Sequence, residues 1–344
     1  MRELARQVLE GEEAWVVGGA VRDELLGRPL VDLDIACAEP ERAARDYARR
    51  SGGAPFPLSE RHGAWRVALE DGRTVDFTPL AHGIERDLAT RDFTINAIAE
   101  PLAGGEQFDP SGGREDLAFH TIRAVSDSVF EDDPLRLLRA VRLEDELGFH
   151  LAPLTEELVR RDAALVVKPA GERILAELQR LSAAGFRRLD GLGLLAPLGG
   201  RIDDRLDRID SPEYRLVAVF GEHLRTLPIA NETKRYLAAL LRATPPEGRS
   251  ARAVHRFRRV TEPWALDALA FVGASDLAPL VEEARAADPA APLVRGDELG
   301  LPPGPAIGAI LAEIDEERAA GTLRTREEAL ELGRRRAEAL RSDG

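Results

Sequence analysis

Two aspartates one residue apart, Asp32 and Asp34, follow a glycine-rich segment that runs from Gly18 to Asp23. Alternate side chains of a β-strand point to the same face, so a strand here holds the two carboxylates side by side. Adjacent carboxylates repel each other, and a divalent cation removes that repulsion. Because oxygen-rich sites suit Mg²⁺ or Mn²⁺, we expect Asp32 and Asp34 to form a catalytic metal site.

The segment upstream has residue types that hold a phosphate chain. Gly18 and Gly19 open a predicted helix, whose first backbone amides can face an anion, and Arg22 lies one turn inside it. A glycine pair alone describes only a tight turn, and two alternate aspartates alone describe a solvated strand face. Because the two motifs follow each other closely, the functional interpretation is favoured. A metal and a phosphate chain together indicate phosphoryl or nucleotidyl transfer.

The elements expected to position these groups alternate between strand and helix. Apolar patterning predicts a strand at 14–17, a helix at 22–26, a strand at 30–36 and a helix at 39–51. A hairpin follows, with strands at 66–70 and 73–77 joined by the two-residue turn Asp71-Gly72. Asp76 falls on the polar face of that hairpin, where a third acid can join the first two.

A second motif extends from Thr90 to Ala97. Arg91 has the chemistry to bind a phosphate or a ribose hydroxyl. Asp92 is expected to cap a helix or to orient Arg91, and Asn96 is expected to join two backbone segments. An ordinary helix N-terminus is the alternative, but we favour a functional Arg91.

A third motif begins with two acids, Asp132 and Asp133, followed by Pro134. Proline suits the first turn of a helix, with either acid as its cap. The helix carries three arginines that recur every third residue and spread over a broad face: Arg136, Arg139 and Arg142. An acid and an arginine three residues apart can read the edge of a base by hydrogen bonds. A surface helix with solvated arginines is the alternative.

The rest of the chain has a different pattern. A glycine-rich segment at 109–117 is expected to be a structural connector, or a hinge between the head and the helices. From about Ala118, helical periodicity replaces strand signals, with breaks expected at 191–200, 244–248 and 300–308. The sequence thus predicts an α+β fold, in which a small mixed head domain precedes an all-helical remainder.

Composition limits the class of protein. The chain has 344 residues, 44% of them hydrophobic, and no apolar run long enough to span a membrane. The N-terminus lacks the apolar core of a signal peptide, and the single cysteine, Cys37, excludes an intramolecular disulfide and a cysteine-cluster zinc site. We therefore expect a cytoplasmic protein that does not bind membranes. The net charge of −14, taken alone, argues against nucleic-acid binding, and the six histidines form no His-Asp pair of the kind used by phosphohydrolases.

Together, these motifs resemble class II tRNA nucleotidyltransferases, the family of CCA-adding enzymes and bacterial poly(A) polymerases. The resemblance runs from Gly18 to about Arg142. It continues in four further segments: Ala170–Ile174 with Glu177–Leu178, Gly296–Leu299, Pro303–Pro305 and Thr325–Ala329. It implies a polymerase-β-like palm in a catalytic head at 1–117, a helical neck at 118–190, a body at 191–262 and a tRNA-binding tail at 263–344.

The resemblance also implies a role for each candidate residue. Asp32 and Asp34 would bind two Mg²⁺ ions that activate the RNA 3′-hydroxyl and stabilise the in-line transition state, and pyrophosphate would leave. Nucleotide binding is implied for Gly18, Gly19, Arg22, Arg91, Asp133, Arg136, Arg139 and Arg142. Among these, Asp133 and Arg136 would read the incoming base. The implied activity is addition of CCA to the 3′ end of tRNA from CTP and ATP.

Three features depart from the family pattern. Asp132 stands where the family has glutamate, and Thr90 replaces the first of two arginines. The stretch between Asp76 and Arg91 is short, which is a trait of members that add only the two cytidines. Addition of CC alone, addition of A alone and poly(A) synthesis therefore stay open. A non-catalytic RNA-binding protein and a small-molecule nucleotidyltransferase are less favoured, and the sequence does not fix the oligomeric state.

The resemblance gives the basic residues an expected role despite the acidic total. A basic stripe is expected on the neck: Arg136, Arg139, Arg142, Arg160, Arg161 and Arg173. Further basic clusters lie at Arg256, Arg258 and Arg259 and at 334–336. Contacts between these residues and phosphates would make RNA binding dependent on salt.

Overall fold

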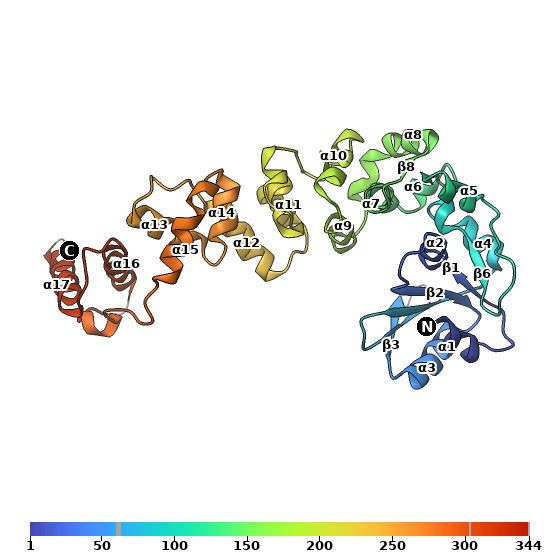
Figure 1. Ribbon diagram of the computed structural model, residues 1–344, viewed down its shortest axis with the longest axis horizontal. Helices are drawn as coiled ribbons and strands as arrows, with labels where there is room; N and C mark the ends of the chain where they lie inside the picture. Colours follow the sequence, from blue (N-terminus) through green and yellow to red (C-terminus); the bar gives the residue numbers. More distant parts are fainter. Residues whose placement is uncertain (60–62, 303, 343–344) are drawn as a thin grey trace. The chain divides into compact units, whose positions relative to one another are not determined.

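The computed structural model describes residues 1–59, 63–302 and 304–342, so His62 and Pro303 lie outside the described residues. Two compact units divide the chain, Met1–Gly200 and Arg201–Gly344, and each is described by itself. The predicted α+β fold is confirmed, because a mixed sheet lies in the first unit and most of the remaining described chain is helical (Figure 1). The finer division at residues 117, 190 and 262 stays a prediction.

The sheet of the first unit has six strands in the order β3-β4-β5-β2-β1-β6. The strands are β1 (Ala14–Val17), β2 (Asp32–Cys37), β3 (Ala54–Ser59), β4 (Ala64–Ala68), β5 (Thr74–Pro79) and β6 (Ala99–Pro101). β2 and β5 run parallel, whereas the other neighbours run antiparallel. The parallel register pairs Asp34 with Asp76, so two central strands bring the predicted acids together.

The two faces of the sheet differ because side chains alternate along each strand. Leu33, Ile35 and Phe77 are fully buried, and Phe77 packs against Tyr47 with 5.8 Å between ring centroids. Tyr47 belongs to α3 (Pro40–Ser51), which covers β4 and β5, and α1 (Arg2–Val8) packs against α3. The aspartates of β2 alternate to the opposite face, where α2 (Gly19–Leu25) packs on β1 and β2 (Figure 1).

The hairpin between β4 and β5 exists, but its predicted two-residue turn is wrong. The Leu69 amide donates to the Arg73 carbonyl at 2.9 Å, and the Gly72 amide donates back to the Leu69 carbonyl at 3.1 Å. Three residues, 70–72, therefore form the loop, and Gly72 takes the positive φ of +83° that such a loop needs at its last position. The turn dipeptide was identified correctly, but its register was off by one residue.

Other boundaries moved slightly. α2 begins at Gly19 instead of residue 22, and β2 begins at Asp32 instead of residue 30. Pattern reasoning missed β3, whose two prolines are unfavourable inside a sheet but acceptable on the edge strand that β3 forms. Two-residue strands β7 (Thr121–Ile122) and β8 (His150–Leu151) also interrupt the part that was expected to be entirely helical.

The remaining helices of the first unit surround the site described below. They are α4 (Ile84–Ala89), η1 (Thr94–Asn96), α5 (Gly113–Ala118), α6 (Val129–Asp132), α7 (Arg136–Leu147), α8 (Pro153–Arg161), η2 (Ala163–Val167), α9 (Gly171–Leu178) and α10 (Ala183–Gly191), where η marks a 3₁₀ helix. In the glycine-rich segment before α5, Asp109 accepts hydrogen bonds from the amides of Gly113 and Arg114, and the choice between connector and hinge stays a prediction. A Cβ at Gly113 would lie 2.1 Å from the Thr94 carbonyl oxygen, so this close backbone approach requires glycine.

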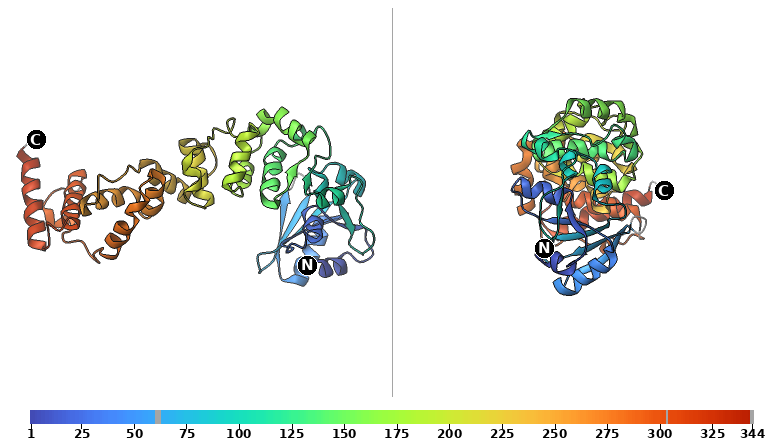
Figure 2. Two further views of the ribbon diagram at one scale, coloured as in Figure 1. Left: turned by 45° about the horizontal axis from the view of Figure 1, so that its top comes forward. Right: turned by 90° about the vertical axis from the view of Figure 1, so that its right-hand side faces the viewer.

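The described part of the second unit is helical throughout (Figure 2). Its helices are η3 (Asp204–Asp207), α11 (Pro212–Phe220), η4 (Gly221–Thr226), α12 (Asn231–Arg242), α13 (Ala251–Thr261), α14 (Ala265–Val272), η5 (Ser275–Leu277), α15 (Ala278–Ala286), η6 (Gly296–Leu299), α16 (Pro305–Ala319) and α17 (Arg326–Ser342). The expected break at 244–248 separates α12 from α13. The break expected at 300–308 is shorter, because α16 already begins at Pro305, a residue type that suits a first helical turn.

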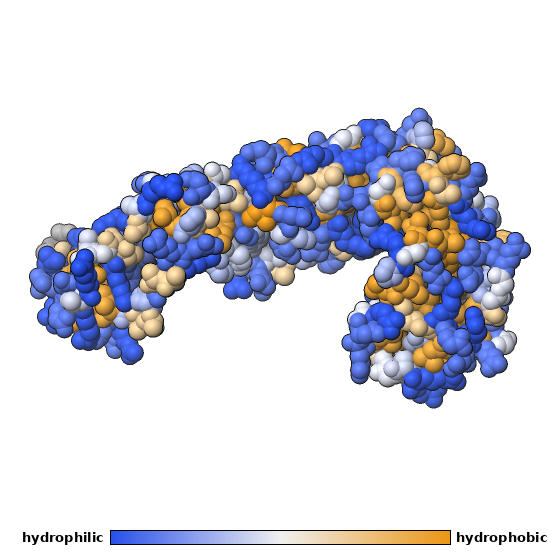
Figure 3. Space-filling view, in the orientation of Figure 1, coloured by the Kyte–Doolittle hydropathy of each residue, from blue (hydrophilic) through white to orange (hydrophobic). Residues whose placement is uncertain are grey.

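The face of both units visible in Figure 3 carries polar and apolar groups. Figure 3 shows hydrophilic residues over most of the visible face, with apolar groups between them. Within the described residues, no helix combines the length and the apolar character that crossing a bilayer requires.

Candidate active site

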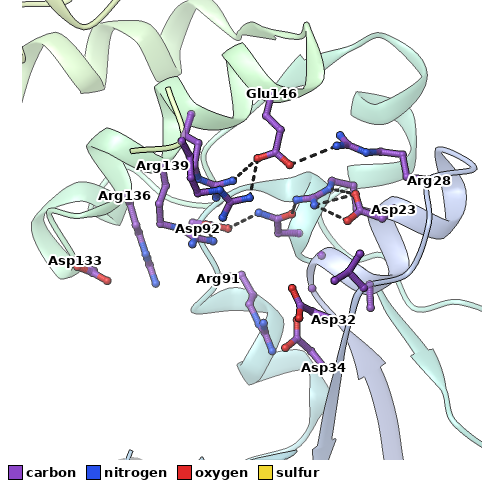
Figure 4. A pocket seen from close by; sticks show the side chains of 18 of the residues that line it. Asp23, Arg28, Asp32, Asp34, Arg91, Asp92, Asp133, Arg136, Arg139 and Glu146 are labelled. Atoms are coloured by element: carbon purple, nitrogen blue, oxygen red, sulfur yellow. Dashed lines mark hydrogen bonds and ion pairs between the residues drawn. The ribbon is translucent and has the colours of Figure 1, made fainter. Parts of the chain in front are cut away.

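The predicted motifs converge on a cavity of about 690 Å³ in the first unit (Figure 4). Its walls come from the β1–α2 junction, β2, the α4–η1 segment, the α6–α7 region and α9. All ten predicted catalytic and nucleotide-binding residues line it: Gly18, Gly19, Arg22, Asp32, Asp34, Arg91, Asp133, Arg136, Arg139 and Arg142. Segments more than 100 residues apart in the sequence therefore share one chemical environment.

Asp32 and Asp34 lie on one face of β2, as the alternation predicted. Asp32 is exposed, and its Oδ1 accepts a hydrogen bond of 2.6 Å from the hydroxyl of Thr74. Asp34 is half-buried, and burial raises its pKa to about 6, although the charge of Arg91 opposes the rise. The carboxylates of Asp76 and Asp32 raise it further. A bound cation would stabilise the ionised Asp34 carboxylate, because it offsets both the burial of that charge and its repulsion by Asp32.

Asp76 lies beside Asp34 in the register, but its oxygens have another partner. Arg66 donates from Nε to Oδ1 and from Nη2 to Oδ2, both at 2.7 Å, and the Asp76 side chain is buried. Asp76 is not among the residues that line the cavity. Within the described residues, no cluster of three or more acidic, histidine or cysteine ligands has metal-binding geometry. The donor set on β2 is therefore the pair Asp32 and Asp34, whose oxygens suit Mg²⁺ or Mn²⁺.

Gly18 allows Arg91 to approach Asp34. Its φ of +71° is a left-handed conformation that disfavours other residues. A Cβ at this position would lie 3.1 Å from Nη1 of Arg91 and 3.4 Å from Oδ2 of Asp34. Figure 4 shows Arg91 directed toward the two aspartates. Arg91 is also held by Asp87, one turn earlier on α4, at 2.8 Å.

Arg22 is buried beneath the glycine pair and has protein partners. Its Nη1 donates to Oδ1 of Asn96 at 2.7 Å, and its Nε donates to Asp23 at 2.9 Å. The amide of Asn96 in turn donates to Oδ1 of Asp92 at 2.9 Å. Asn96 therefore joins two segments, as expected, through side chains instead of backbone groups.

Asp92 is not the helix cap that the sequence predicted. The residue that precedes η1 is Phe93, and the buried Asp92 carboxylate instead accepts from Arg139 at 2.8 Å. Burial alone would raise the pKa of Asp92, but the charge of Arg139 and the hydrogen bonds from Asn96, Arg139 and the Phe93 amide hold it below its usual value. Asp92 thus binds the helix α7 to the head.

The three arginines of α7 occupy different environments. The helix begins at Arg136, two residues later than predicted, and Nη2 of Arg136 donates to the Thr90 carbonyl at 2.6 Å. Arg142 is buried, with 2.5 Å from its Nε to Glu177 and 2.6 Å from its Nη1 to Glu146. Arg139 lies between them and binds Asp92. The broad face expected from the spacing is therefore present, but only Arg136 and Arg139 are partly open to solvent.

The predicted basic stripe is only partly continuous. Arg136, Arg139, Arg142 and Arg173 line the cavity, whereas Arg160 pairs with Glu156 and Arg161 pairs with Asp162. In the second unit, three of the predicted basic residues pair with acids: Arg256 with Glu316, Arg258 with Asp288 and Arg336 with Glu313.

Sequence reasoning missed three charged residues of the cavity: Arg28, Glu146 and Arg180. The Glu146 carboxylate accepts hydrogen bonds from three arginines: Arg142, Arg180 at 3.0 Å and Arg28 at 3.4 Å. Figure 4 labels Arg28 and Glu146. Its position four residues after Arg142 was a usable signal for an ion pair on one helix face. Arg28 and Arg180 lie outside any motif and carry no such signal.

Comparison with known proteins supports the resemblance. The poly(A) polymerase head domain matches residues 14–81 and 65–123. A CC-adding tRNA nucleotidyltransferase of Geobacter sulfurreducens is 47% identical over 174 residues, which cover 50% of this chain and 40% of that protein. One from Thermus thermophilus is 39% identical over 246 residues, 67% of this chain and 56% of that protein. Residues 14–123 thus carry the poly(A) polymerase head domain, and the chain is similar to curated tRNA nucleotidyltransferases.

Other relatives differ in the reactions for which they are named. An A-adding tRNA nucleotidyltransferase of Deinococcus radiodurans is 44% identical over 193 residues, 53% of this chain and 44% of that protein. The chain spans about half the length of the curated relatives that it matches.

Solved structures share the fold at lower identity. The CCA-adding enzyme of Thermotoga maritima, complexed with tRNA, has a TM-score of 0.70 at 22% identity and covers 96% of this chain and 94% of its own. A CCA-adding enzyme complexed with CTP has a TM-score of 0.75 at 21% identity and covers 96% and 93%. The fold of this chain therefore matches that of CCA-adding enzymes over nearly its whole length.

Proposed function

We propose that this protein is a tRNA nucleotidyltransferase that adds CCA to the 3′ end of tRNA from CTP and ATP without a nucleic-acid template. The observation that carries the proposal is the single cavity that contains both the carboxylate pair Asp32 and Asp34 and the acid–arginine pair Asp133 and Arg136. The first pair suits nucleotidyl transfer, and the second suits reading of a base.

The transfer joins the RNA 3′-oxygen to the α-phosphorus of the nucleotide and releases pyrophosphate. Asp32 and Asp34 would hold two Mg²⁺ ions, which when bound supply charge for a bound hydroxyl and for the leaving phosphates. Arg91, beside Asp34 and partly open to the cavity, would bind the sugar or a phosphate of the nucleotide. Gly18 and Gly19 keep that approach free of side chains, and the buried Arg22 supplies fixed positive charge below the triphosphate.

Base choice would follow from hydrogen-bond polarity. Cytosine and adenine both present an amino group on the pairing edge, and uracil and guanine present a carbonyl oxygen there. The Asp133 carboxylate accepts from an amino group but repels a carbonyl oxygen, and Arg136 donates to a ring nitrogen. Arg139 and Arg142 complete this side of the cavity and hold α7 in place.

The helical second unit would hold the tRNA through its arginines, many of which lie on the surface. Such contacts recognise phosphate and shape. Because the substrates are tRNA and nucleoside triphosphates, the proposed location is the cytoplasm.

Addition of CC alone is a second candidate. Only four residues, 80–83, connect β5 to α4, so the segment that the resemblance links to the change from CTP to ATP is short. Two of the relatives described above are named CC-adding tRNA nucleotidyltransferases.

One experiment tests both candidates. The protein is incubated with Mg²⁺ and tRNA that ends at the discriminator base, with CTP, ATP or both, and the products are sized. Three nucleotides added in the presence of both CTP and ATP support CCA addition. Two nucleotides added both with CTP alone and with CTP plus ATP support CC addition. No extension in any of the three reactions contradicts the proposal. Long A-tails on an oligo(A) primer from ATP alone would indicate a poly(A) polymerase instead.

A further inference from the structure

Asp133, in the segment between α6 and α7, has an ion-pair partner on α9. Nη2 of Arg173, in the first turn of α9, lies 2.8 Å from Oδ2 of Asp133, and Nη1 lies 3.4 Å from Oδ1. The two residues are 40 positions apart, and both line the cavity. The contact therefore exists because α7 and α9 pack together, not because the residues are neighbours in the chain.

The contacts leave Asp133 a restricted set of free acceptor positions. A carboxylate offers about four lone-pair positions. Arg173 occupies one on each oxygen, and the Leu135 amide donates to Oδ1 at 3.2 Å. The carboxylate is thus held in one orientation from two sides, and the free acceptor capacity lies mainly on Oδ2.

Arg173 lacks the features of a residue that holds the core together. Its side chain is 52% exposed and that of Asp133 is 31% exposed, whereas Arg142 on the neighbouring helix is buried between two glutamates. A pair this exposed contributes little to folding stability because water screens it. The contact therefore has more effect on where the Asp133 carboxylate points than on whether the unit folds.

We propose that Arg173 is a positioning residue for base selection, which acts by fixing the Asp133 carboxylate toward the incoming base. This inference rests on the proposed function. A fixed carboxylate meets the amino group of cytosine or adenine and opposes the carbonyl oxygen of uracil or guanine. Without Arg173, the Asp133 side chain can rotate away from the base, and the repulsion that excludes uracil is lost.

The test compares selectivity instead of activity alone. For the wild type, Arg173→Ala and Arg173→Lys, kcat/KM is measured for CTP and UTP in single-nucleotide addition to tRNA ending at the discriminator base. Dissociation constants for both nucleotides are measured without tRNA. Arg173→Ala should lower the CTP/UTP ratio by about tenfold, through a higher KM for CTP and a lower KM for UTP, with the same loss in the ratio of dissociation constants. Arg173→Lys, which keeps the charge but loses the planar fork, should restore the ratio only in part.

A matched control and a double mutant separate this role from a general effect. Arg45→Ala removes a similarly exposed arginine that pairs with Glu41 outside the cavity, and it should keep the wild-type ratio. Adding Arg173→Ala to Asp133→Ala should change the ratio no further, since the proposed effect passes through Asp133. A wild-type ratio in Arg173→Ala, or additive losses in the double mutant, would overturn the inference. Absence of tRNA extension by the wild type would instead overturn the proposed function.

Discussion

Two nitrogens of Arg139 converge on one oxygen of Asp92, at 2.8 Å from Nε and 2.7 Å from Nη2. The residues lie 47 positions apart, on α7 and on the segment between α4 and η1. Asp92 also accepts from Asn96, which binds Arg22, so one polar chain connects α7 to the helix that the glycine pair opens. These buried hydrogen bonds and ion pairs therefore fix the positions of the segments that line the cavity.

Loss of that ion pair should destabilise the first unit. Asp92→Ala leaves the half-buried Arg139 and the buried Asn96 amide without their acceptor, so we expect the free energy of unfolding to fall by about 2 kcal/mol. Urea denaturation measures it. Arg160→Ala, which removes an exposed pair, should stay within about 0.5 kcal/mol of the wild type. An unchanged midpoint for Asp92→Ala would mean that the pair does not hold the unit together.

The carboxylate pair should be essential for turnover but not for folding. We expect Asp32→Ala and Asp34→Ala each to lower kcat by several orders of magnitude with Mg²⁺, because each removes an oxygen ligand. Circular dichroism should be unchanged. Asp71→Ala, in the exposed hairpin loop, serves as the control and should keep full activity. Near-normal turnover in either variant would contradict the metal site.

The raised pKa of Asp34 makes the stability of the metal-free protein depend on pH. In the folded protein this pKa is about 6 instead of 3.8, so between these values the folded state binds more protons than the unfolded state. The contribution of Asp34 to stability is therefore least favourable above pH 6 and is neutral below pH 4.

Asp34→Asn should consequently raise the Tm in EDTA at pH 7.5 and leave it unchanged near pH 4. In the wild type, Mg²⁺ should raise the Tm less as the pH falls through 6, because protons compete for the carboxylate. Thermal scans across this range provide the measurement. A lower Tm for Asp34→Asn at pH 7.5 would show that burial does not penalise this charge.

Gly18→Ala should damage the site through both strain and contact. The φ of +71° disfavours alanine, and the new methyl group would press against Arg91 at 3.1 Å. Gly52, with a φ of +75° and no atom within 4 Å of the place that a methyl group would take, provides the control for strain alone. Both variants should lose about 1 kcal/mol of stability, but only Gly18→Ala should raise the KM for nucleotides. Equal KM values for the two variants would show that contact between the new methyl group and Arg91 does not impair nucleotide binding.

Arg136 should affect base choice more than tRNA binding. Losing a paired donor to a base edge costs about 1–3 kcal/mol of discrimination, so Arg136→Ala should admit UTP and GTP more readily. Competition between nucleotides in the extension assay measures this selectivity, and filter binding measures tRNA affinity. If affinity for tRNA falls while selectivity is retained, Arg136 binds phosphate instead of a base.

The sequence was informative where a local rule fixes geometry. Alternation along a strand placed Asp32 and Asp34 on one face, and a proline-led motif located the start of α7 to within two residues. The hairpin register was missed because both two- and three-residue loops accept the same Asp-Gly pair.

The partners of the site residues could not be predicted in the same way. The Asp92–Arg139 pair depends on how α7 packs on the segment between α4 and η1, and the Asp133–Arg173 pair depends on how α9 packs beside α7. No periodicity in the sequence records such contacts. Asp92 was expected to act as a cap, because capping is the local solution for an acid before a helix. Tertiary packing supplied a charged partner in place of that local role.

The contact between Arg136 and residue 90 has a consequence for how this region can evolve. The acceptor is the main-chain carbonyl of Thr90, which every amino acid possesses. The tether is therefore indifferent to the side chain at position 90, provided that the backbone keeps its path. Threonine can therefore stand here in place of an arginine without disturbing the orientation of Arg136. Other substitutions at position 90 should likewise leave this hydrogen bond unchanged.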